Sequence, residues 1–174
     1  MFLEAFESGK KVKKGDIMKR VGILVSVLIL VFCSLLLFAD GPSKVMIGTW
    51  KLDPAKSKYS GAVPKSQVAK LEEVDAALKV VSDRVEADGK MTHFEWTAKF
   101  DGKDYPVKGD SGRDAVSVKK IDDYTLEITN KKAGKVTTTI KAVYAKDGKS
   151  RTETATGTDA QGKKVENVTQ WMKQ

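Results

Sequence analysis

Residues of the types that catalyse reactions or ligate metals are scarce in this sequence. Its only histidine is His93, and its only cysteine, Cys33, lies inside an uncharged run. A zinc or haem site would need His93 to point inward beside further ligands. The alternation of polar and apolar residues around His93 instead places it on the polar face of a strand. The acidic pairs Glu72-Glu73 and Asp122-Asp123 would point to opposite faces on strands. We therefore expect no catalytic residue, no metal site, no cofactor and no enzymatic activity.

Aromatic residues are the stronger candidates for binding chemistry. The candidate ligand-lining set comprises Phe94, Trp96, Phe100, Tyr124, Tyr144 and Trp171. Such side chains can form the wall of a cavity that holds an apolar or amphipathic molecule, or they can be ordinary packed core. The threonines at 152, 154, 156 and 158 alternate with other residues, and we expect them to face solvent. If they faced inward instead, the interior would be partly polar.

Strands must position these side chains. From Thr92 to Phe100, apolar and polar residues alternate with a period of two, which is typical of a half-buried β-strand. Asp101-Gly102 then favours a tight turn into a second strand over 103–108. Asp53-Pro54 could cap a single helical turn over 55–59. The other expected strands are 46–52, 67–73, 78–86, 115–121, 124–129, 136–144, 151–158 and 165–172.

The strands follow one another with short turns, and Gly-Lys pairs recur at several of these turns. A run of eight to ten antiparallel strands has two edges, and closing the sheet into a barrel removes both. We therefore expect an all-β, up-and-down meander closed into a barrel over residues 46–174. A barrel of that size can enclose one small ligand.

The chain begins with a basic leader over residues 1–20, which holds six lysines and arginines. Residues 21–39 are uncharged and would make a helix of about 28 Å, close to the thickness of a bilayer. This apolar helix is either a cleaved signal peptide or a retained transmembrane anchor, and the sequence leaves both open. In either case the rest of the chain would be extracytoplasmic, that is periplasmic or secreted, and a retained helix would anchor it to the inner membrane. Residues 40–45 would form a linker.

The net charge is +8, of which +3 lies in residues 1–39. The remaining positive charge is spread along the sequence, without the basic cluster and neighbouring aromatics that nucleic-acid binding requires. This distribution is typical of a solvated surface. We expect no nucleic-acid partner and a monomeric domain.

The segment Gly48-Thr49-Trp50-Lys51-Leu52 resembles the opening strand of the calycin barrels, the lipocalins and fatty-acid-binding proteins. The chain is also similar to short secreted bacterial barrel proteins. The calycin resemblance implies that Gly48 and Trp50 close one end of the barrel. It further implies that a basic side chain from a late strand, Lys173 or Arg151, lies against the tryptophan.

Two departures from that family bear on the function. Residues 53–65 are too few for the two-helix lid of the fatty-acid-binding proteins, and Thr169-Gln170-Trp171 lacks their carboxylate-binding arginine. We therefore expect an exported lipocalin-like barrel that binds a small apolar or amphipathic ligand. The alternative is a membrane-anchored structural or protein-interaction module whose barrel is packed and ligand-free.

Overall fold

A computed structural model describes residues 41–174 of the chain. The expected basic leader and apolar helix, residues 1–39, lie outside the described residues. Within the described part of the chain, no helix is long and apolar enough to cross a bilayer.

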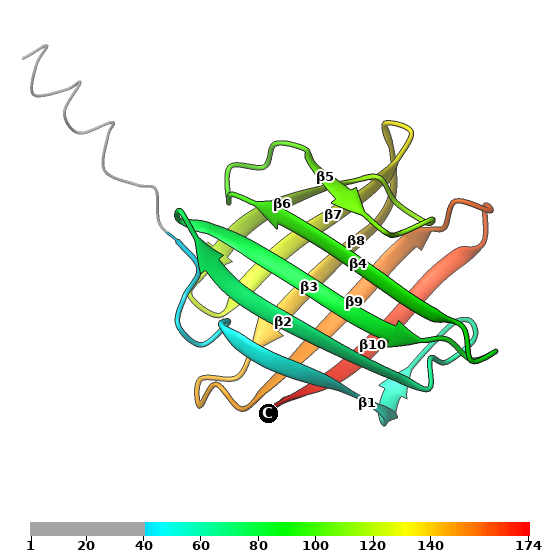
Figure 1. The fold of residues 1–174 in the computed structure, drawn as a ribbon, viewed down its shortest axis with the longest axis horizontal. Coiled ribbons are helices and arrows are strands. Elements are labelled where there is room, and N and C mark those ends of the chain that lie inside the picture. Colours follow the sequence, from blue (N-terminus) through cyan, green and yellow to red (C-terminus); the bar gives the residue numbers. More distant parts are fainter. Residues whose placement is uncertain (1–40) are drawn as a thin grey trace, which may run out of the picture. The chain divides into compact units, whose positions relative to one another are not determined.

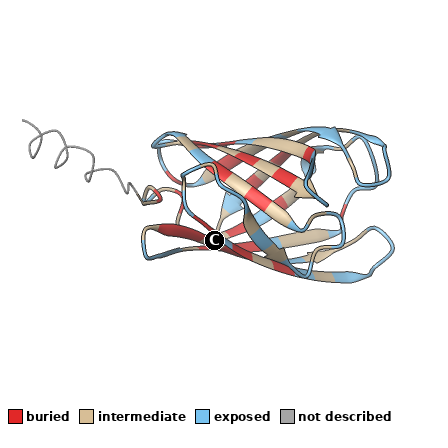
Figure 2. Ribbon diagram, turned by 90° about the horizontal axis from the view of Figure 1, so that it is seen from above, coloured by how far each residue is buried: buried red, intermediate tan, exposed pale blue. Residues whose placement is uncertain are grey.

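Ten antiparallel strands form one closed barrel, in which each strand pairs with its neighbour in sequence and β1 pairs with β10 (Figure 1). The strands are β1 (Gly48–Lys58), β2 (Ser66–Val74), β3 (Ala77–Val85), β4 (Met91–Ala98), β5 (Tyr105–Lys108), β6 (Ala115–Asp122), β7 (Thr125–Lys132), β8 (Lys135–Tyr144), β9 (Ser150–Thr158) and β10 (Lys164–Lys173). The predicted all-β, up-and-down meander is confirmed, and so is its closure into a barrel. Figure 2 shows most of the buried residues along the strands.

The expected helical turn over 55–59 is wrong, because β1 continues as a strand to Lys58. Its register with β10 shifts between Asp53 and Lys58. Inside this irregular stretch the Lys56 amide donates to Asp53 Oδ1 at 3.3 Å, and Ser57 Oγ donates to the Asp53 carbonyl at 2.7 Å. Asp-Pro can begin a helix, but proline is equally tolerated where a strand bulges, and the bulge prevails here.

The predicted pairing of the strands on either side of Asp101-Gly102 is observed, since β4 pairs antiparallel with β5, but the expected tight turn between them is wrong. Strand β4 ends at Ala98 and β5 begins only at Tyr105. Between them, the backbone of Asp101 forms an isolated β-bridge with Lys119 of β6, and the Gly102 amide donates to the Val118 carbonyl at 3.1 Å. This segment therefore reaches past the short strand β5 to β6 before the chain turns back. The Asp101 side chain stabilises that path by accepting from the Lys103 amide and the Tyr105 hydroxyl, both at 3.0 Å.

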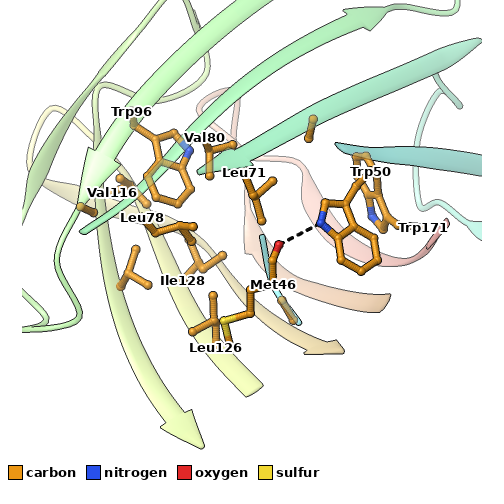
Figure 3. Packing of buried hydrophobic residues seen from close by; sticks show 14 of the residues in the cluster. Met46, Trp50, Leu71, Leu78, Val80, Trp96, Val116, Leu126, Ile128 and Trp171 are labelled. Atoms are coloured by element: carbon orange, nitrogen blue, oxygen red, sulfur yellow. Dashed lines mark hydrogen bonds between the residues drawn. The ribbon is translucent and has the colours of Figure 1, made fainter. Parts of the chain in front are cut away.

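One end of the barrel is closed by packed side chains. Trp50 and Met46 are fully buried there, and the Trp50 indole donates to the Met46 carbonyl at 3.0 Å (Figure 3). The segment before β1 folds onto this end, since the Met46 amide donates to the Ser43 carbonyl and Lys173 Nζ donates to the Val45 carbonyl. Residues 41–45, expected as a linker, therefore belong to the folded barrel. We call this the closed end.

The opposite end of the barrel carries a different set of connections. The connections at the closed end are 75–76, 99–104, 123–124 and 145–149, and those at the opposite end are 59–65, 86–90, 109–114, 133–134 and 159–163. Because consecutive strands are antiparallel, the connections alternate between the two ends. We call this second end the open end, because most of its connections line the mouth of a cavity inside the barrel.

Candidate functional site

The interior of the barrel holds a cavity of about 450 Å³. Connections 59–65, 86–90, 109–114 and 159–163, all at the open end, contribute residues to its lining. None of the closed-end connections does so. The cavity is therefore entered from the open end and floored by the packed residues around Trp50.

An apolar wall makes up much of the cavity. Inward-facing residues of β2, β3, β4 and β7 form it: Leu71, Leu78, Val80, Phe94, Trp96 and Ile128. These side chains come together because the strands register their inward-facing positions opposite one another, as in the pairs Leu71↔Val80 and Val80↔Trp96. Period-two alternation is thus converted into one continuous apolar surface.

Four of the six aromatic candidates, Phe94, Trp96, Tyr144 and Trp171, line the cavity. Phe100 and Tyr124 do not. Phe100 follows the end of β4 and packs from outside the cavity against the core, and Tyr124 lies in the turn between β6 and β7. We expected both residues to continue the alternation of a strand. Phe100 instead lies just after β4 and Tyr124 just before β7, both at the closed end.

Gly48 and Trp50 lie at the closed end. Two basic residues were candidates for contact with the Trp50 ring. Both lie against it: Arg151 Cζ and Lys173 Nζ are each 5.2 Å from the Trp50 ring centroid. Gly48 has φ +138°, and a Cβ there would come within 2.7 Å of Lys173 Cε. The absence of a side chain at Gly48 therefore lets Lys173 cross the end of the barrel.

A polar cluster lies at the floor of the cavity, and we call Arg151, Tyr144 and Glu153 the deep polar cluster. Arg151 is only 6% exposed. Its Nη1 donates to the Tyr144 hydroxyl at 3.1 Å, and its Nη2 pairs with Glu153 Oε1 at 3.1 Å. The guanidinium also lies over the rings of Trp171 and Tyr144, at 4.6 and 5.6 Å from their centroids. Aromatic faces therefore surround a cation that is already paired with a carboxylate.

One atom of this cluster has no partner. Arg151 Nε is buried and makes no hydrogen bond to any described residue. Burial alone would lower the pKa of Arg151, but the charges of Glu153 and Tyr144 raise it by more, so the guanidinium stays charged. Burial raises the pKa of the Tyr144 hydroxyl. The floor of the cavity thus presents a charged donor group with unused hydrogen-bonding capacity.

A second arginine reaches the cavity from the connection between β5 and β6. Arg113 Nε donates to Asp110 Oδ2 at 2.9 Å and its Nη1 donates to Asn130 Oδ1 at 2.7 Å. The same guanidinium lies 4.4 Å from the Phe94 ring centroid. Burial lowers the pKa of Arg113, and Asp110 opposes that effect. This network ties the 109–114 connection, which leads into β6, to the neighbouring strand β7.

A third ion pair lies beside the open end. Arg84 Nε and Nη2 both contact Glu86 Oε1, at 2.7 and 2.6 Å. Tyr59 is close to these charges, and burial, followed by the negative charges of Glu153 and Glu86, raises its pKa to about 12. The Tyr59 hydroxyl is therefore neutral at physiological pH and can both donate and accept a hydrogen bond.

Apart from Arg151, which the calycin resemblance offered as a partner of Trp50, sequence reasoning missed the arginines and acids that line the cavity. For Glu153 a signal was available. The outward direction expected for the threonines of β9 is observed: Thr156 and Thr158 are exposed, and Thr152 bonds to Gln170 at 2.9 Å. If the threonines face outward, the intervening Arg151 and Glu153 must face inward. No comparable signal identifies Arg113, because it lies in a connection.

His93 is on the surface of the barrel, where its Nδ1 lies 2.7 Å from Asp83 Oδ1. Both side chains are more than half exposed. Among the described residues, no group of three or more histidine, cysteine or acidic side chains is placed to hold a metal ion.

No known family model matches this chain, and a comparison with curated proteins finds no match. Its function is therefore inferred from the geometry of the cavity.

Proposed function

We propose that this protein binds one small amphipathic molecule inside the barrel, in the manner of a lipocalin and without catalysing a reaction. The cavity carries this proposal. Its volume of about 450 Å³ lies within the range of roughly 300–1,000 Å³ found for small-molecule sites. An apolar wall beside a few placed polar groups is also the usual composition of such sites.

The polar groups argue against the alternative of a barrel packed only for stability. A buried ion pair is usually no more stabilising than well-packed apolar side chains of similar volume. Arg151 and Glu153 occupy interior positions that leucine or valine could fill, and Arg151 Nε has no partner there. Selection for stability alone gives no reason for this arrangement, whereas recognition of a polar group on a ligand does.

We also propose that the barrel works outside the cytoplasm. The support for this is the uncharged run at 21–39 with its preceding lysines, together with a barrel sequence that contains no cysteine. Mass spectrometry of the mature amino terminus tests it: loss of residues 1–39 supports secretion, and an intact run in a membrane fraction supports an anchor. Recovery of full-length protein from the cytoplasm would contradict export.

Ligand binding is tested by titrating residues 40–174 and the full chain with N-phenyl-1-naphthylamine, an uncharged apolar fluorophore. We expect saturable binding with one site per barrel. Ala155 lines the cavity, whereas its neighbour Thr156 is exposed on the outer face. Ala155→Trp should therefore reduce affinity at least tenfold, and Thr156→Trp should leave it unchanged.

Two results would contradict the proposal. One is the absence of saturable fluorescence enhancement from a folded barrel. The other is equal affinity in the Ala155→Trp and Thr156→Trp variants, which would place the probe on the outer surface. Either result favours the packed interaction module.

A further inference from the structure

We infer that the ligand carries an uncharged head group that accepts a hydrogen bond from Arg151, and that Glu153 excludes carboxylates. This inference rests on the proposed function and specifies its ligand. It follows from the deep polar cluster and from the pairing of positive and negative charges along the cavity.

The positive charges that line the cavity are all paired with carboxylates. Three arginines and four carboxylates contribute to the lining, and no lysine does so among the described residues. Each arginine has a carboxylate within ion-pair distance: Arg84 with Glu86, Arg113 with Asp110, and Arg151 with Glu153. The cavity therefore has no excess positive charge to neutralise an anionic ligand.

At the floor of the cavity, Arg151 has more N–H donors than its protein partners use. A guanidinium has five N–H groups, and the hydrogen bonds of Arg151 use one at Nη1, to Tyr144, while Nη2 meets Glu153. Its Nε is buried without an acceptor. Because Nε is closed off from the cavity while Arg151 itself lines it, the donors that a ligand acceptor would meet are the remaining N–H groups of Nη1 and Nη2.

The carboxylate of Glu153 beside Arg151 favours a neutral acceptor over an anionic one. An ionised head group close enough to bond Arg151 would also lie near Glu153, whose Oε1 is 3.1 Å from the same guanidinium. Repulsion between two carboxylates is strong where water is largely excluded. An amide, ketone or ester carbonyl, or an alcohol, can accept the same hydrogen bond without that repulsion.

The orientation of the ligand follows from these contacts. The deep polar cluster lies toward the closed end, since Tyr144 ends β8 and pairs with Arg151, which in turn pairs with Trp171. The apolar wall of Phe94, Trp96 and their neighbours extends from there toward the open end. The head group would therefore enter first, with its hydrocarbon chain along the wall.

The experiment compares ligands of one chain length in displacement of N-phenyl-1-naphthylamine. Dodecanamide and 2-dodecanone supply neutral acceptors, dodecanoate supplies an anion at pH 8, and all are used below their aggregation limits. We expect the neutral compounds to bind wild type at least tenfold more tightly than dodecanoate. Glu153→Gln should raise the affinity for dodecanoate at least tenfold and change the affinity for dodecanamide by less than threefold.

Glu166→Gln is the matched control. Glu166 lies on the neighbouring strand β10, is exposed and pairs with Lys164, so this variant loses the same charge from the outer face. It should reproduce the wild-type preference. Binding of dodecanamide by Glu153→Gln shows in the same titration that this variant is folded.

The outcomes separate this inference from the proposed function. If dodecanoate binds wild type as tightly as the neutral compounds, or if Glu153→Gln leaves their ratio unchanged, the inference is overturned while probe binding still supports a ligand-binding barrel. The same holds if the probe binds but none of the compounds displaces it. If the probe itself shows no saturable binding, the proposed function fails as well.

Discussion

Replacing Arg151 by methionine tests whether the deep polar cluster is arranged as the structure describes. Methionine keeps a flexible unbranched stem against Trp50 and Trp171 but removes all five donors. The variant leaves Glu153 without its 3.1 Å partner and Tyr144 without the donor to its hydroxyl. The two losses act on buried or largely buried groups, so both should weaken the folded state.

The expected magnitude follows from these contacts. Breaking a buried ion pair by removing one partner costs about 3–5 kcal/mol, and the lower end applies because the Glu153 side chain is 18% exposed. The stranded Tyr144 hydroxyl adds to this cost, while relief of the unpartnered Nε subtracts from it. We expect Arg151→Met to lower the free energy of unfolding by about 3 kcal/mol. With a urea m-value of about 2 kcal/mol/M, the midpoint falls by about 1.5 M.

A double-mutant cycle isolates the ion pair. Arg151→Met with Glu153→Gln removes both charges, so the double variant should be more stable than the sum of the single changes predicts, by at least about 1.5 kcal/mol. Urea unfolding followed by tryptophan fluorescence gives all four values, because Trp50, Trp96 and Trp171 all lie in the barrel interior. A loss below about 1 kcal/mol for Arg151→Met, or strict additivity, would refute the burial and pairing on which the reasoning depends.

Three further predictions concern single side chains. Gly48→Ala should destabilise the barrel by about 1–3 kcal/mol in urea unfolding, because Gly48 has φ +138° and a Cβ there would meet Lys173. The control, Gly61→Ala, should change the free energy of unfolding by less than about 0.5 kcal/mol. Equal losses in the two variants would contradict the packing at the closed end. His93→Ala should change stability by less than about 1 kcal/mol, since its pair with Asp83 is solvent-exposed, and a larger loss would be inconsistent with a surface position. The pKa of Tyr59, raised from 10.0 to about 12 by burial and then by nearby acids, contributes stability that is complete below pH 10 and is lost as the pH rises through 12. Tyr59→Phe should therefore lose less stability between those pH values in urea midpoints measured across the range, and parallel curves would contradict the shift.

Alternation of apolar and polar residues made the barrel predictable. Each strand with one inward face, such as the stretch from Thr92 to Ala98, carries a period of two that survives in the structure. The Gly-Lys turns mark where several strands end, as at Ala133-Gly134, where both residues have positive φ. These signals are local, and closure follows from them because an open meander leaves two unpaired edges.

The features that were not predictable depend on contacts distant in sequence. Asp75 and Ala76 both have positive φ, in a two-residue turn without glycine, which only the pairing of β2 with β3 enforces. The path of residues 99–104 depends on bonds from Asp101 and Gly102 to β6, which local turn propensity does not reveal. Arg113 reaches the cavity because its connection bends inward to Asn130, a contact between residues seventeen positions apart.

The distribution of packing along the barrel explains how one fold can be stable and still keep an interior space. At the closed end, Trp50, Met46 and Leu126 are fully buried and leave the cavity a dense floor. The deep polar cluster lies at this floor, where Arg151, Tyr144 and Glu153 line the cavity. The dense floor and the closed ring of strand pairs hold the barrel together without filling the space above the floor. A barrel built only for structure would extend the dense packing to both ends.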